Sequence, residues 1–192
     1  DNKHPQALAA AQVEEVAGRV VKALRRFKPQ VVITSDPIGG YRHPDHIAIH
    51  DATVMAFHAA GDPTRYPKAG AAFQPQKLYF NLFPRRWLRL AVRLLPLTGK
   101  DPRHFGRNRD IDLASLAAVD FPVHAAVSLS RRAMEERDQA MACHASQAGS
   151  GPPFRRVLKL MRTVFGQRDL YMRAYPPIEK RRRETDLFEG IT

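Results

Sequence analysis

A short apolar run between two helical patterns constrains the fold of this chain most strongly. Val31-Val32-Ile33-Thr34 shows no polar alternation, which is typical of a strand that is buried on both faces of a parallel sheet. Apolar residues recur at three- and four-residue steps over 13–27, and a second helical pattern covers 44–60. A buried strand between two helices favours an α/β fold in which helices cover the sheet.

The rest of the chain continues this alternation of helices and strands. Further strands are expected at 77–83, 123–129 and 170–175, and further helices at 85–95, 131–143 and 154–164. Ser130 is a suitable N-cap for the helix over 131–143. The polar segment 100–110 is expected to be irregular. We therefore expect one domain over 1–192, with the charged stretch 179–192 as a tail.

Composition excludes several classes of protein. No stretch approaches the roughly 20 consecutive apolar residues that a membrane span needs. Cys143 is the only cysteine, so neither an internal disulfide nor a cysteine-rich zinc cluster can form. No basic-then-apolar leader is visible, and the protein is expected to be soluble and cytoplasmic.

The basic residues are concentrated in two stretches of the chain. The formal net charge is +12, and residues 85–110 hold 8 basic and 2 acidic residues, while residues 149–192 hold 10 basic and 5 acidic. Aromatic residues make up only 8%, and no nucleic-acid-binding motif is present, so no nucleic-acid partner is expected. A solvated basic surface and attraction of an anionic substrate or membrane surface remain open.

The basic segment 85–95 has an amphipathic pattern. Its apolar face is predicted to contain Trp87, Leu88, Ala91, Leu94 and Leu95. Three interpretations remain open: a peripheral helix packed on the domain, a lid over a substrate pocket, or a helix lying weakly on an anionic membrane surface. The wider stretch 85–120 is interpreted as a variable basic insert or lid.

The window from Gly39 to Asp51 carries the chemistry. Proline is favoured at the first position of a helix, so Pro44 makes His43 the N-cap and places Asp45 and His46 in the first turn. The paired glycines before it allow a tight backbone close to a ligand. His43, His46 and His50 are spaced so that all three can share one side of the helix.

Histidines and a carboxylate at such a position suit metal binding or proton transfer. Neutral imidazole is a common metal ligand and a second imidazole can shuttle a proton, while a neighbouring carboxylate fixes the tautomer. A zinc hydrolase needs three protein ligands and an open position for water. The window supplies one or two ligands and an acid. A polar helix start, with His43 as a simple cap and His46 packed against a neighbour, explains the same residues.

The string GGYRHPDH, from Gly39 to His46, resembles the second signature of the PIG-L/LmbE-like family of zinc-dependent N-acetylglucosaminyl deacetylases. The resemblance extends to RRFKPQVVITSDP before it and HDATVMAFHAAGDP after it, and continues in KLYF, in ACHASQ near Cys143 and in DLYMRAYP. Residues 85–120 match poorly. The resemblance implies a Rossmann-like, mostly parallel sheet with helices on both faces.

The family's roles transfer to individual residues of the window. His46 is expected to bind zinc, and His43 to act as the general acid that protonates the departing amine. Asp45 is expected to orient its neighbouring histidine, and Tyr41 to contact the substrate and polarise the scissile carbonyl. Further substrate contacts are expected from four residues: Gly40, Arg42, His144 and Gln147.

Two departures from the family pattern affect these expectations. Arg42 stands where the family commonly has glycine, and its side chain either reaches an anionic substrate group or points to solvent. The family's first signature, of the His-Pro-Asp-Asp-Glu type, is absent, and His4-Pro5-Gln6-Ala7 does not match it. That signature supplies the other zinc ligands and the general base. We therefore expect a C-terminal portion that lacks the first βα units, binds zinc poorly alone and is inactive alone.

The expected activity is removal of an acetyl or other acyl group from the nitrogen of an amino-sugar conjugate by zinc-activated water. Zn²⁺ is the expected cofactor, although another divalent metal such as Fe(II) suits the same ligands. The alternative is a basic, non-catalytic binding module that keeps only part of the metal site. A Cys143–His144 thiol site and an HD-type phosphohydrolase built on His50-Asp51 are disfavoured. The remaining histidines, expected to be surface or satisfied residues, are His4, His58, His104 and His124.

Overall fold

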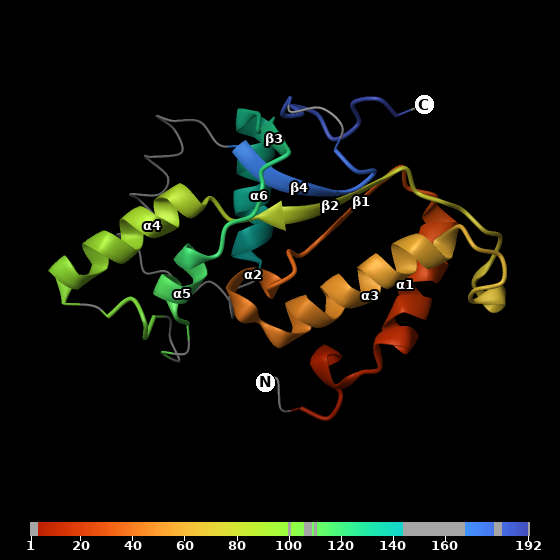
Figure 1. Ribbon diagram of the computed structural model, residues 1–192, viewed down its shortest axis with the longest axis horizontal. Helices are drawn as coiled ribbons and strands as arrows, with labels where there is room; N and C mark the ends of the chain where they lie inside the picture. Colours follow the sequence, from red (N-terminus) through yellow and green to blue (C-terminus); the bar gives the residue numbers. More distant parts are fainter. Residues whose placement is uncertain are drawn as a thin grey trace. The chain divides into compact units, whose positions relative to one another are not determined.

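The computed structural model describes residues 4–99, 101–105, 109, 111–143, 168–178 and 182–191, with only the backbone of residues 86 and 87. The chain forms two compact units (Figure 1). Unit 1 consists of Asp1–Phe83, Phe121–Ala125 and Leu170–Thr192, and unit 2 consists of Pro84–Asp120 and Ala126–Asp169. No helix among the described residues is long and apolar enough to cross a membrane.

The sheet confirms the α/β class. Strand β1 (Val31–Thr34) pairs in parallel with β2 (Lys77–Leu82), and β2 pairs antiparallel with β4 (Arg168–Tyr175). With β3 (Ala125–Ser128) the strand order is β1-β2-β4-β3. The sheet is therefore mixed, and the strand expected at 170–175 runs against its neighbour β2 instead of extending a parallel set.

Two long helices cover one face of β1 and β2 in unit 1. Helix α1 (Val13–Phe27) and helix α3 (Pro44–Ala60) lie side by side in Figure 1, and both have the bounds that the periodicity predicts. Small residues on α3 allow α1 to approach closely, because alanine side chains leave the two backbones near each other. The buried core shared by these elements contains Val16, Ala17, Val21, Leu24, Val32, Ala52, Ala56, Phe57, Ala59, Ala60, Leu78 and Phe80.

A buried arginine closes the end of this helical layer. The Arg25 side chain is buried, and its guanidinium donates hydrogen bonds to the carbonyl oxygens of six residues. These acceptors lie at the end of α3 and in the loop that leads through the short helix η2 (Pro67–Ala69): Ala59, Ala60, Asp62, Arg65, Tyr66 and Gly70. One side chain on α1 therefore holds a loop more than thirty residues away in sequence.

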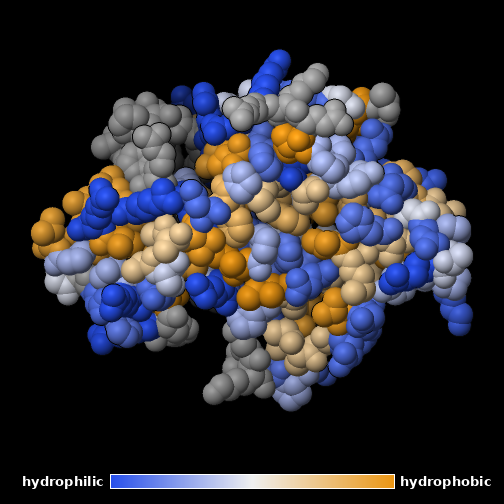
Figure 2. Space-filling model, viewed as in Figure 1, coloured by the Kyte–Doolittle hydropathy of each residue, from blue (hydrophilic) through white to orange (hydrophobic). Residues whose placement is uncertain are grey.

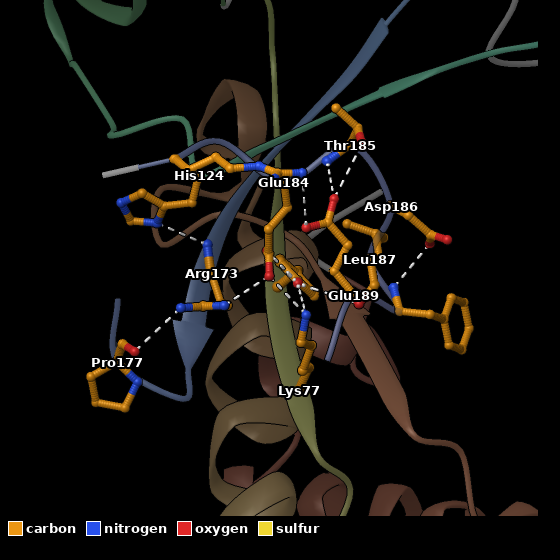
Figure 3. A network of polar contacts seen from close by, with 12 residues as sticks. Lys77, His124, Arg173, Pro177, Glu184, Thr185, Asp186, Leu187 and Glu189 are labelled. Atoms are coloured by element: carbon orange, nitrogen blue, oxygen red, sulfur yellow. Dashed lines mark hydrogen bonds and ion pairs between the residues drawn. The ribbon is translucent and has the colours of Figure 1, made fainter. Parts of the chain in front are cut away.

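The opposite face of β2 holds a buried polar network (Figure 3). Lys77 Nζ donates to Glu184 Oε1 at 2.8 Å and to the Tyr79 hydroxyl at 3.0 Å, and that hydroxyl donates to Glu184 Oε2 at 2.6 Å. Arg173 Nη1, from β4, donates to Glu184 Oε1 at 2.8 Å. Glu184 and Leu187 are buried, so the described part of the charged C-terminal stretch, residues 182–191, packs on the sheet through these two residues.

This network shifts the ionisation of two of its members. Burial alone would raise the pKa of Glu184, but the hydrogen bonds from Lys77 and Tyr79 and the nearby positive charges hold that pKa below its ordinary value. Burial, and then the hydrogen bond to Glu184, raise the pKa of Tyr79. The folded state therefore favours a charged Glu184 and a neutral Tyr79 over a wide pH range.

Unit 2 contains α4 (Arg85–Leu94), η3 (Leu95–Thr98), α5 (Leu113–Ala118), α6 (Arg131–Ala142) and most of β3. Arg85 donates to the Leu116 carbonyl, and Arg89 Nε donates to the Ala117 carbonyl at 3.2 Å, which ties α4 to α5. Ser130 is the N-cap of α6, as predicted, because its hydroxyl accepts the Ala133 N–H at 3.1 Å.

The apolar face expected for segment 85–95 is only partly correct. Leu88, Ala91 and Leu95 are half-buried, but Leu94 is exposed, because α5 covers one side of α4 only. The helix expected at 154–164 lies outside the described residues. In the described part of 100–110, the backbone of Phe105 pairs with that of Ile111.

Candidate functional site

The loop after β1 is held by a buried aspartate. Asp36 Oδ1 accepts hydrogen bonds from the backbone N–H groups of Ile38 at 3.1 Å and Gly40 at 2.8 Å. This closes the chain into the short helix α2 (Gly39–Arg42), which begins with the paired glycines. The carboxylate thus organises the backbone that leads into α3 at the carboxyl end of β1.

The two glycines of this loop are required by geometry. Gly39 and Gly40 have φ of +64° and +70°, in the left-handed region that side chains disfavour. A Cβ on Gly39 would lie 2.8 Å from Ile47 Cγ1, and one on Gly40 would lie 2.9 Å from the ring of Phe83. A side chain at Gly39 would push the loop away from the start of α3, and one at Gly40 would collide with Phe83.

The start of α3 has the predicted geometry. Pro44 is its first residue and His43 its N-cap, and His43 Nδ1 accepts the Asp45 N–H at 3.2 Å. Because an imidazole nitrogen that accepts a hydrogen bond carries no proton, the neutral His43 ring has its proton on Nε2. The cap therefore determines which ring nitrogen of His43 is a donor.

Three aromatic rings gather at this helix start. The ring centroids of His43 and His46 are 4.8 Å apart, and the Tyr41 ring is 5.5 Å from each of them with an edge-on orientation. All three side chains are half-buried. The structure thus brings together the residues to which the resemblance assigns the acid, the metal ligand and a carbonyl contact.

Asp45 connects this cluster to the N-terminal segment. Its Oδ2 lies 4.0 Å from His43 Nδ1, and its Oδ1 accepts the backbone N–H of Ala9 at 2.8 Å. Ala9 belongs to the short helix η1 (Leu8–Ala10). The carboxylate therefore lies beside His43 while it holds η1 against the start of α3.

His50 is placed differently from the other two histidines of the helix. It is buried, its Nδ1 is 2.7 Å from the Ser35 carbonyl oxygen, and its ring packs 4.5 Å from that of Phe80. A carbonyl only accepts, so Nδ1 carries the proton. His50 therefore anchors α3 to the end of β1, and its ring packs on Phe80 instead of joining the Tyr41–His43–His46 cluster.

The described residues do not by themselves form a zinc site. Among them, no three histidine, cysteine, aspartate or glutamate side chains are arranged to hold a metal ion. A catalytic zinc needs about three protein ligands, and the ring cluster offers His46 with His43 and Asp45 beside it. His144 and Gln147, expected near the substrate, lie outside the described residues.

Arg42 occupies a strained backbone position. Its φ is +66° and it is exposed, and glycine is the residue that adopts this conformation without cost. We expect Arg42→Gly to raise the free energy of unfolding by about 1 kcal/mol, measured by urea denaturation. Arg42→Ala is the matched control, since alanine keeps the Cβ that causes the strain. Equal stabilisation by both variants would contradict this explanation.

Comparison with known proteins identifies a related family. Residues 3–57, which contain the whole window, match the family described as "PIG-L: GlcNAc-PI de-N-acetylase". The chain is related to the PIG-L family. Two similar proteins are 1D-myo-inositol 2-acetamido-2-deoxy-alpha-D-glucopyranoside deacetylases. The one from Geodermatophilus obscurus is 37% identical over 80% of this chain and 51% of its own length. The one from Kineococcus radiotolerans is 35% identical over 100% of this chain and 54% of its own length.

Two further proteins extend the comparison. The mycothiol S-conjugate amidase of Streptomyces coelicolor is 34% identical over 95% of this chain and 62% of its own length. The crystal structure of the conserved protein TT1542 from Thermus thermophilus has a TM-score of 0.52 and 21% identity, over 86% of this chain and 61% of that one, which shows a shared fold. The chain thus spans 51–62% of the length of these proteins.

Sequence reasoning missed two supporting residues of the site. Asp36 locks the loop, and the pattern Asp-Pro-x-Gly-Gly is a turn signal that could have revealed it, because aspartate side chains accept N–H groups a few residues ahead. The bond from Ala9 to Asp45 joins residues 36 apart and carries no local signal.

Proposed function

We propose that this sequence belongs to a hydrolase that removes an acetyl or other acyl group from the nitrogen of an amino-sugar conjugate. The observation that carries the proposal is the N-cap of α3. It leaves the proton of neutral His43 on Nε2, in a ring 4.8 Å from His46 and 5.5 Å from Tyr41. A proton donor, a candidate metal ligand and a hydroxyl thus meet at the carboxyl end of β1.

Amide hydrolysis needs what these groups supply. The tetrahedral intermediate carries an oxyanion, and donors such as His43 Nε2–H and the Tyr41 hydroxyl stabilise it. The amine must then be protonated before it leaves. For that step the His43 ring takes a second proton from solvent on Nδ1, in exchange for its cap bond, beside the Asp45 carboxylate 4.0 Å away. Nε2 then gives its proton to the amide nitrogen as the C–N bond breaks, and the ring returns to a neutral form with its proton on Nδ1.

We also propose that the activity depends on a divalent metal, Zn²⁺ in the first place, with His46 as one ligand. The other ligands would come from residues outside the described part of the structure, because the described ones do not complete a site. The names of the relatives support this substrate class, since they specify an acetamido-glucopyranoside linked to inositol and a mycothiol conjugate.

The test is an amine-release assay on the full-length gene product that contains this sequence. The substrates are N-acetylglucosamine α-linked to inositol and free N-acetylglucosamine, with and without a chelator. We expect amine release that the chelator abolishes, and a loss of about 100-fold or more in His43→Gln, because general acid catalysis contributes about that much. His58→Gln, an exposed histidine on the same helix, is the matched control and should retain activity.

Three outcomes would contradict the proposal. They are absence of amine release from any N-acylated sugar, unchanged activity in His43→Gln, and insensitivity to chelation. Substrate binding without release would favour the alternative, a non-catalytic basic binding module. The isolated polypeptide 1–192 is expected to bind zinc poorly and to release no amine. Robust activity from it would place all ligands within this sequence.

A further inference from the structure

Helix α4 and the turn that follows it expose a stripe of leucines. Leu90, Leu94 and Leu97 are 44%, 49% and 82% exposed, and their spacing of four and three residues places them on one side of the helical segment. We call these three residues the leucine stripe. Large aliphatic side chains in a row on the surface usually mark an interaction site.

The other side of α4 is already occupied. Arg85 and Arg89 bond to carbonyl oxygens of α5, and Arg89 also forms an ion pair with Asp120 at 3.5 Å. Leu88 and Leu95 are half-buried on that side. The leucine stripe is therefore a second apolar surface, separate from the one that packs α4 within unit 2.

Exposed arginines lie close to the leucine stripe along the chain. Arg93 lies between Leu90 and Leu94 along the helix and is exposed, and Arg103 and Arg109 are exposed farther along the chain. Residues 85–110 contain 8 basic residues, of which Arg85 and Arg89 bond to α5, and only 2 acidic residues. One of the two, Asp101, bonds locally to His104 and to the Arg103 backbone. Figure 2 shows hydrophobic surface beside hydrophilic side chains over α4.

We propose that the leucine stripe and its basic surroundings dock on the surface of an anionic lipid bilayer. A row of leucines enters the boundary between headgroups and acyl chains, while arginines contact the phosphates, and the two contributions add. The excess of positive charge selects an anionic surface over a neutral one. Because no described helix can span a membrane, the contact is peripheral and reversible. This inference does not depend on the proposed hydrolase activity.

Vesicle co-sedimentation of the polypeptide 1–192 tests the proposal. The vesicles are pure phosphatidylcholine, or phosphatidylcholine with about 30% phosphatidylglycerol, at about 50 mM and about 500 mM salt. We expect partitioning at least about tenfold stronger on the anionic vesicles, and a loss of about tenfold at the higher salt concentration. Trp87 is the only tryptophan, so a blue shift of its emission on binding would report that α4 enters the interface.

Matched variants separate the two contributions. The double variant Leu90→Ser/Leu94→Ser and the variant Arg93→Glu should each lower partitioning by about tenfold or more. Phe27→Ser removes a residue that is 71% exposed in unit 1, and Lys68→Glu reverses an exposed charge there, and both should bind as the parent does. All replaced residues are exposed, so folding should be unaffected.

Several results would overturn the proposal. Absence of binding at low salt, equal binding to neutral and anionic vesicles, or unchanged binding in the stripe variants would each do so. Sedimentation velocity provides a further check. Self-association that the Leu90→Ser/Leu94→Ser variant abolishes would identify the leucine stripe as an interface between copies of this chain instead of a lipid contact.

Discussion

Replacing Arg25 by methionine should lower the free energy of unfolding by about 4 kcal/mol. Methionine keeps the length and apolar stem of the side chain but removes all five N–H donors. Six carbonyl oxygens at the end of α3 and in the following loop would lose this donor group, and a buried polar group without a partner costs about 1–3 kcal/mol. Water can enter to satisfy the exposed part of the loop, so the costs do not add fully.

Urea denaturation followed by circular dichroism measures this change. Arg26→Met is the matched control, because the neighbouring arginine is exposed, and we expect a change below about 0.5 kcal/mol there. Arg25→Lys should lie between the parent and Arg25→Met, since an ammonium offers three donors from a single point. A cost below about 1 kcal/mol for Arg25→Met would show that the loop does not depend on this side chain.

Neutralising Glu184 should destabilise the fold by about 3 kcal/mol. Glu184→Gln preserves shape and one acceptor, but it leaves Lys77 and Arg173 without their opposite charge on the buried face of β2. Breaking one partner of a buried ion pair is costly because the other charge remains desolvated. Glu135→Gln, in an exposed pair with Arg131, is the control and should cost less than about 0.5 kcal/mol.

A double-mutant cycle distinguishes charge loss from a packing defect. Lys77→Met should be destabilising in the parent chain, yet neutral or stabilising in the Glu184→Gln background, where it removes a buried ammonium that has lost its carboxylate. If the two changes simply add, the ion pair is not what holds the C-terminal segment on the sheet.

Glu184 should also make the free energy of unfolding depend on pH in the acidic range. In the folded protein the pKa of Glu184 is held below its ordinary value. The stabilisation that the charged carboxylate provides is therefore fully present above the unfolded-state pKa of about 4.3, and it is lost as the pH falls through the folded-state pKa. We therefore expect the free energy of unfolding to decline below about pH 4.5, with a shallower decline in Glu184→Gln. An identical acid profile in both proteins would contradict this assignment.

The local elements of unit 1 were largely predictable. Helices α1 and α3 begin and end where the periodicity placed them, and His43 caps α3 as the proline after it implies. These features depend on neighbours within a turn of helix, so the sequence contains the information directly. The direction of β4 was not predictable in this way, because strand pairing is decided between segments far apart in the chain.

The sequence by itself therefore determined the helix start that carries Tyr41, His43 and His46, since short-range capping and backbone preferences build it. Only the tertiary structure decided which buried charges support the fold. Arg25 and Glu184 look like ordinary surface residues in their basic or charged stretches, yet Arg25 is buried against the Ala59 carbonyl 34 residues away and Glu184 against Lys77, 107 residues away. Burial of a charged side chain is favourable only when distant segments supply its partners, and no local pattern records where those segments meet.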